Sequence, residues 1–105
     1  MAQFDVHANQ DPGTRGRIPY LVDVQSDLLD DLASRVVVPL MPADNPVLRP
    51  LTRLTPVFEF DGQAFVFVTP ELAGVSRSVL GRKVASLEAH RHTIVSAFDI
   101  LISGV

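Results

Sequence analysis

Residues 57–68 read VFEFDGQAFVFV, and this stretch determines the fold class that we predict for the chain. Aromatic and β-branched residues, which favour strands, lie on both sides of a central Asp61-Gly62. An Asp-Gly pair readily adopts the positive φ angles that a tight hairpin turn needs. We therefore predict a β-hairpin with strands at 57–60 and 64–68.

The hairpin carries four phenylalanines, at positions 58, 60, 65 and 67. Aromatic side chains on a sheet can stack with the bases of single-stranded nucleic acid, but such surfaces also present Arg or Lys. Residues 57–68 contain neither, and Glu59 and Asp61 are acidic. We therefore expect these phenylalanines to pack in the core.

Four more segments carry strand signals, either period-two alternation or a short β-branched run. Segments rich in glycine, proline and polar residues separate them. Pro39 would remove a ladder hydrogen bond, so it predicts an edge, a bend or a bulge within its strand. The predicted strands span residues 3–8, 20–25, 35–40 and 75–80, the last closed by Gly81, and the proline-rich residues 41–50 are predicted to form a loop.

Helical signals are short except near the C-terminus. Ser26 is predicted to cap one helical turn within 26–31, and Thr69 another that ends at Gly74. A longer helix is predicted at 87–102, with Gly104 ending it and an apolar stripe of Ile94, Val95, Phe98, Leu101 and Ile102. Several strands followed by one helix predict a mainly β protein, namely a small SH3-like barrel with a C-terminal α-helix in a single domain, residues 1–105.

Composition narrows the possible functions. The net charge of −3 is not the basic balance that duplex nucleic acid attracts, and no polybasic stretch suits an anionic membrane surface. The chain has no cysteine, which excludes disulfides, thiolate metal sites and a cysteine nucleophile. Without a visible signal peptide or a long apolar run, we expect a cytoplasmic protein that does not enter a membrane. A hydrophobic fraction of 47% fits either a rich core or apolar surface buried against another subunit.

The histidines and serines form no recognisable catalytic or metal motif. His90 and His92 are two positions apart on the predicted helix and so point in different directions, and His7 lies on the outward row of the first strand. We expect surface histidines, no metal, no cofactor and no catalytic residue.

An acidic cluster at Asp23, Asp27, Asp30 and Asp31 has two interpretations. Paired carboxylates can catalyse hydrolysis, but no nearby motif would set their geometry, so we do not favour catalysis. Partner binding stays open, because the cluster surrounds the apolar pair Leu28-Leu29.

Residues 20–30, YLVDVQSDLLD, resemble the signature of the CcdB family, the toxins of plasmid and chromosomal addiction modules. The similarity continues in the same order along nearly the whole chain. It includes VVPL at 37–40, Pro56-Val57, Asp61-Gly62, AGV at 73–75, Leu80-Gly81, VASL at 84–87, Arg91, Ile94, Ala97 and the final Gly104-Val105.

This resemblance implies an SH3-like barrel that forms a symmetric homodimer and acts by binding rather than by catalysis. Such toxins bind the A subunit of DNA gyrase and trap the enzyme after it has cut DNA. A CcdA-like antitoxin neutralises the toxin with a disordered segment that folds along the dimer, and residues 9–17 correspond to a loop that contacts it. The pair represses its own operon, so the toxin meets operator DNA only through the antitoxin.

The resemblance also implies which residues bind gyrase. They are the apolar pair Leu28 and Leu29 and, near the C-terminus, Asp99, Ile102, Ser103, Gly104 and Val105. Well-known members carry Trp at the position of Ser103. Truncating a buried Trp anchor commonly costs ~2 kcal/mol or more of binding energy, so the change predicts weaker gyrase binding or another target.

Two alternatives follow from these observations. One is a non-toxic or retargeted relative that acts as an antitoxin-binding dimer and transcriptional co-regulator. The other is an endoribonuclease similar to MazF, which shares this barrel. The net charge of −3 and the acidic residues 27–31 disfavour the ribonuclease, which needs a positive substrate groove.

Overall fold

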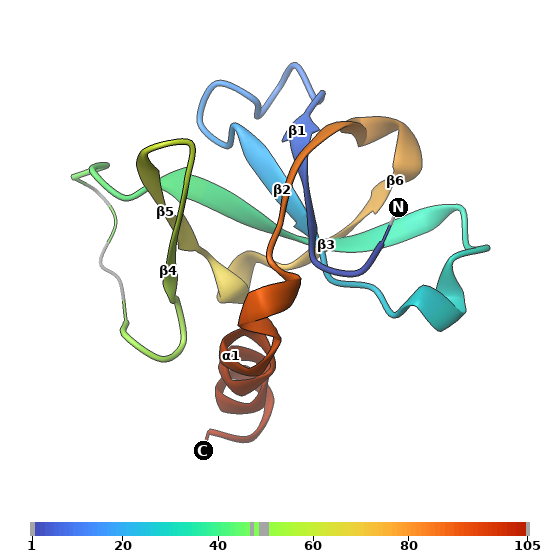
Figure 1. The fold of residues 1–105 in the computed structure, drawn as a ribbon. Coiled ribbons are helices and arrows are strands. Elements are labelled where there is room, and N and C mark those ends of the chain that lie inside the picture. The colour runs from blue at the N-terminus through green and yellow to red at the C-terminus, as the bar shows by residue number, and fades with distance from the viewer. Residues whose placement is uncertain (1, 47, 49–50, 105) are drawn as a thin grey trace.

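The computed structural model describes residues 2–46, 48 and 51–104. In this part of the chain, seven strands are followed by one α-helix, α1 (Arg91–Ser103) (Figure 1). The strands are β1 (Asp5–Asn9), β2 (Tyr20–Asp23), β3 (Ser34–Pro42), β4 (Val57–Phe60), β5 (Gln63–Phe67), β6 (Ala73–Ser76) and β7 (Leu80–Ser86). The one-turn 3-10 helices are η1 (Asp27–Leu29), η2 (Thr69–Glu71), η3 (Arg77–Val79) and η4 (Glu88–His90).

The predicted hairpin is confirmed. β4 pairs antiparallel with β5, with Phe58 opposite Phe65. Asp61 and Gly62 have φ angles of 53° and 74°. Two consecutive positive φ angles are typical of a type I′ turn, whose twist matches that of the two strands.

β3 is the longest strand and the centre of the sheet. The strand order is β4-β5-β3-β2-β1-β7, and β6 also pairs with β3. Along one edge of β3, residues 34–37 pair with β6 and residues 40–42 pair with β5. Pro39 lies between these two stretches, and its carbonyl accepts from Val68 N–H on the same edge. An N–H at position 39 would point into the gap where the partner of this edge changes from β6 to β5, so the sheet tolerates its absence in Pro39.

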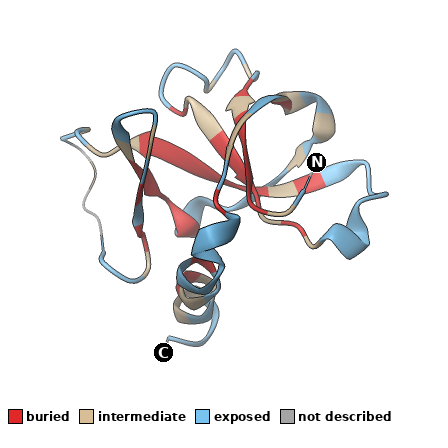
Figure 2. Ribbon diagram, viewed as in Figure 1, coloured by how far each residue is buried: buried red, intermediate tan, exposed pale blue. Residues whose placement is uncertain are grey.

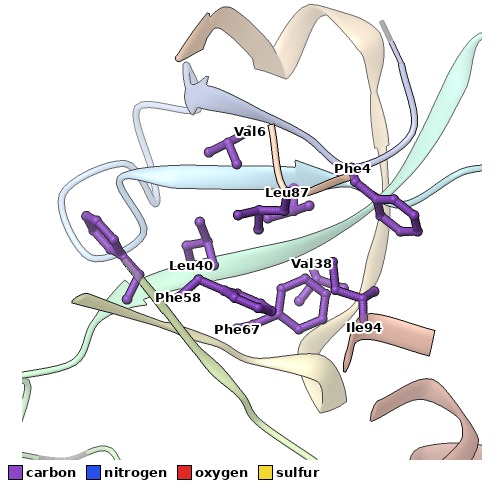
Figure 3. Packing of buried hydrophobic residues seen from close by; sticks show 10 residues of the cluster. Phe4, Val6, Val38, Leu40, Phe58, Phe67, Leu87 and Ile94 are labelled. Carbon is purple, nitrogen blue, oxygen red and sulfur yellow. The ribbon is translucent and has the colours of Figure 1, made fainter. Parts of the chain in front are cut away.

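The sheet curls into a half-barrel, so the predicted SH3-like barrel with a C-terminal helix is confirmed (Figure 1). Its main core joins side chains from β1, β2, β3, the hairpin and α1 (Figure 3). Phe67 is fully buried, and its ring packs edge-on against Phe58 and Phe98 at centroid distances of 5.7 and 6.2 Å. The prediction that the hairpin phenylalanines pack in the core is also confirmed, with Phe58, Phe65 and Phe67 buried and Phe60 packed against the cluster.

α1 begins later than predicted, at Arg91 rather than at residue 87. Leu87 is still bound to the N-terminal segment, because its N–H donates to Phe4 O at 2.8 Å. Arg91 donates to Gln3 Oε1 at 2.9 Å, and its guanidinium lies 4.8 Å from the centre of the Phe4 ring.

The predicted apolar stripe of α1 is only partly right. Ile94 and the small Ala97 are the buried residues of the helix, whereas Val95 is 43% and Ile102 79% exposed. The buried stripe therefore follows Ile94 and Ala97, with Phe98 and Leu101 partly buried, rather than Val95 and Ile102. No helix in the described part of the chain has the length and apolar character to cross a membrane.

The predicted strand at 75–80 is only partly right, because residues 75–76 belong to β6 and residue 80 to β7, with η3 between them. β6 ends at Ser76, whose hydroxyl accepts from Ser78 N–H and starts η3. A seventh strand, β7, then runs through Gly81 instead of ending there. Its charged residues gave no strand signal, but pairing with β1 overrides local propensity. Gly81 is needed at this contact, because a Cβ atom would lie 2.9 Å from Ala8 O.

Other boundaries shift by a few residues. β1 is Asp5–Asn9 rather than 3–8, because Phe4 has a positive φ of 71°. β3 continues through Met41 and Pro42, where the proline-rich sequence predicts a loop, because both residues pair with β5. The turn at 69–71 forms, but Val68 rather than Thr69 is its cap, and Gly74 belongs to β6.

We predict that Phe67→Ala lowers the free energy of unfolding by about 3–5 kcal/mol, because it leaves a cavity between the hairpin and α1. Glu59→Ala, at an exposed position of the same hairpin, should change it by less than ~0.5 kcal/mol. Urea denaturation at a fixed protein concentration measures both values. Equal stability of the two variants would contradict this core assignment.

Candidate functional site

Three leucines lie on the surface in and next to η1. Leu28, Leu29 and Leu32, which we call the leucine platform, are 94%, 50% and 49% exposed. Figure 2 shows the segment around η1 as exposed. Single exposed leucines are ordinary, but three within five residues form a local apolar surface that suits a partner.

A buried ion pair holds this segment against the sheet. The side chains of Arg35 on β3 and Asp23 on β2 are both 0% exposed, and Nη2 of Arg35 lies 2.6 Å from Oδ2 of Asp23. Nε of Arg35 donates to the same oxygen at 3.1 Å. Nη1 of Arg35 reaches out of the core to Oδ1 of Asp30 at 2.9 Å. One buried guanidinium therefore links two strands of the sheet to the end of η1.

Further hydrogen bonds fix the backbone of the segment. Gln25 donates from Nε2 to Leu29 O at 2.8 Å, and its Oε1 accepts from Val36 N–H at 3.0 Å. Nη1 of Arg77 donates to the carbonyl of Leu32 at 3.0 Å and to that of Asp30. The leucine platform is thus held by side chains from β3, from η3 and from the segment that follows β2.

The aspartates of the predicted acidic cluster have different roles. Asp23 and Asp30 bind Arg35, so they serve to hold the segment in place. Asp27 is exposed and accepts from Gln3 N–H at 2.8 Å. Asp31 is exposed and has no hydrogen bond or ion pair within the described residues. The predicted cap is also present, because Ser26 Oγ accepts from Leu28 N–H at 3.2 Å.

The second group of predicted gyrase-binding residues lies at the end of α1. Asp99, Ile102, Ser103 and Gly104 are exposed there, and Val105 lies outside the described residues. Gly104 ends the helix as predicted, with a φ of 76° and its N–H bonded to Ile100 O. Figure 1 shows η1 and the end of α1 well apart, so one protomer does not bring the two groups together.

The expectation of surface histidines is wrong for His7. His7 is only 4% exposed, because both faces of β1 are covered, the core face and the opposite face that carries His7. Its Nδ1 lies 3.0 Å from Gly81 O, and its Nε2 is buried without a partner in the described part of the chain. His90 and His92 are exposed, as expected. Among residues 2–46, 48 and 51–104, no three His, Asp or Glu side chains gather as metal ligands would.

A groove lies beside the predicted antitoxin-binding loop. Apolar residues from β2, β3 and η3 line it together with Asp11 and Glu71. Asn9 shapes the loop, since its Nδ2 donates to Ile18 O at 2.9 Å and its Oδ1 accepts from Asp11 N–H at 3.0 Å. The groove thus combines an apolar lining with two acidic groups, which suits a partner segment with apolar and basic residues.

The residues that shape the leucine platform were missed in the sequence. Arg35 carried a usable signal, because it alternates with Val37 on β3 and so shares the face of Asp23 on the neighbouring strand. Arg77 carries no such signal, because it lies in a turn that the sequence does not predict and is distant in sequence from the leucine platform.

We predict that Asp23→Leu lowers the free energy of unfolding by about 3–5 kcal/mol, because it leaves Arg35 as an uncompensated buried charge. The double variant Asp23→Leu/Arg35→Met should recover much of this loss, since apolar residues of similar size can replace a buried pair. Asp30→Asn, at the half-exposed end of the network, should cost about 1 kcal/mol or less. Denaturation curves test this order of unfolding free energies. A double variant that is no more stable than Asp23→Leu would contradict it.

A family comparison adds to this geometry. The model of the family described as CcdB protein matches residues 3–104. The match covers both the segment of the leucine platform and the end of α1 through Gly104. The chain therefore belongs to the CcdB family, whose members are toxins of toxin–antitoxin modules that poison DNA gyrase.

Proposed function

We propose that this protein is the toxin of a type II toxin–antitoxin module and that it binds and poisons the A subunit of DNA gyrase. Membership of the CcdB family supports this role in general terms. The observation that carries the proposal for this chain is the leucine platform, where Leu28 is 94% exposed on a segment held by a buried ion pair. Burying one such leucine against a partner contributes roughly 1.5–3 kcal/mol.

The toxin acts by binding, and two contact groups take part. Leu28 and Leu29 form the first, and Asp99, Ile102, Ser103, Gly104 and Val105 form the second. Because the groups lie apart in one protomer, a homodimer that presents each of them twice offers a broad symmetric surface to a symmetric partner.

The outer face of α1 supports the homodimer. Val95 and Ile102 are seven positions apart, so they share one side of the helix, and both are exposed. A second protomer placed against the Val95 part of this side would bury Val95 and leave Ile102, at the end of the helix, for gyrase. Such an interface also accounts for part of the hydrophobic fraction of 47%.

A CcdA-like antitoxin is the proposed neutralising partner. The groove beside residues 9–17 supports this role, because an extended segment can lay apolar side chains into it and place basic ones near Asp11 and Glu71. With a net charge of −3, the toxin would meet operator DNA only through the antitoxin.

A second candidate function rests on Ser103. This residue is exposed at the end of α1, where well-known members carry Trp, and its small side chain offers little area to bury. A relative that has lost or changed its gyrase contact would still form the dimer and bind antitoxin. It would then act as a transcriptional co-regulator. The ribonuclease alternative has less support, because the exposed segment around η1 is acidic.

The test is calorimetry of the purified protein against the A-subunit fragment of its own host's gyrase, with Ser103→Trp alongside. If gyrase is the target, the unmodified protein binds, and Ser103→Trp binds at least ~10-fold more tightly, which is about 1.4 kcal/mol. Gln63→Trp, at an exposed position of the β4–β5 hairpin away from both contact groups, is the control and should not change the affinity.

Other outcomes have distinct meanings. Binding by Ser103→Trp alone favours the second candidate, since the docking surface is then intact but the natural chain has lost this target. If neither protein binds, gyrase poisoning is rejected. Cleavage of RNA by the purified protein would instead favour the ribonuclease.

A further inference from the structure

The leucine platform is preorganised for binding. Its backbone is held by Gln25 at Leu29 O and by Arg77 at Leu32 O, and its acidic end is bound to Arg35. A partner therefore does not have to order this segment, and the entropy cost of docking is correspondingly small. Leu32, which is 49% exposed, extends the apolar surface beyond the pair Leu28-Leu29.

The charge around the leucine platform is one-sided. Residues 26–34 contain three aspartates and no Lys or Arg. Asp30 is bound by Arg35, and Arg77 lies behind the segment with Nη1 on backbone carbonyls. Asp27 and Asp31 remain as exposed carboxylates beside the leucines, and Asp31 has no partner within the described residues.

This charge pattern distinguishes between possible occupants. A second copy docked about a two-fold axis would place the carboxylates of both copies against each other, which is unfavourable. A partner with an apolar pocket bordered by Lys or Arg matches both the leucines and the aspartates.

We propose that Leu32 and Asp31 are specificity-determining residues of the gyrase-binding surface and that the partner presents an apolar pocket with a basic border. This inference rests on the proposed function and adds the chemistry of the partner surface. Leu32 supplies apolar contact area, and Asp31 selects for positive charge.

The test uses the same gyrase A-subunit fragment, with binding measured at about 50 mM and about 500 mM NaCl. Asp31→Lys should weaken binding at least ~10-fold at low salt, and the difference should fall to within ~2-fold at high salt, because salt screens exposed charges. Leu32→Ser should weaken binding ~5-fold or more at both salt concentrations, because the apolar contribution is not screened.

Two matched controls lie elsewhere on the surface. Asp44→Lys and Leu51→Ser change exposed residues of the same types, so they should leave the affinity within ~2-fold of the unmodified protein. If the unmodified protein binds and the platform variants behave like these controls, the inference is overturned while the proposed function stands. If neither the unmodified protein nor Ser103→Trp binds, the proposed function fails and this inference fails with it.

Discussion

The ion pair between Arg35 and Asp23 is the interaction on which the binding surface depends. Both side chains are fully buried, so the charge of each requires the other. The pair connects neighbouring strands in the centre of the sheet, and the remaining donor of Arg35 extends to Asp30 at the edge of the exposed segment. The same guanidinium therefore stabilises the fold and sets the position of Leu28 and Leu29.

The mainly β architecture was predictable because its signals are local. The hairpin turn depends on Asp61-Gly62, and both residues adopt the positive φ angles that this pair favours. The alternating phenylalanines beside the turn are large and apolar, so burial in the core is favoured. Gly104 likewise ends α1 by a conformation that glycine adopts without strain.

The features that were missed depend on contacts between distant parts of the chain. β7 contains Arg82 and Lys83 and looked unlike a strand, but β1 supplies its hydrogen bonds. His7 was expected at the surface because alternation predicts one outward row, whereas this sheet buries both faces of β1. The exposed residues Leu28 and Leu29 were identified through family resemblance and their acidic neighbours. Arg77, which also holds the segment in place, carries no signal in the sequence, and the signal of Arg35 depends on the pairing of β2 with β3.

The single turn of η1 is too short to be stable as an isolated helix, and its shape comes from Gln25, Arg35 and Arg77, which lie outside it. A peptide copied from this segment would therefore lose the shape that the intact protein presents. The same support from outside the turn also affects how the surface of such a protein can vary. The side chains of Leu28, Leu29, Leu32 and Asp31 can change with that partner, because none of them takes part in the hydrogen bonds that hold the turn.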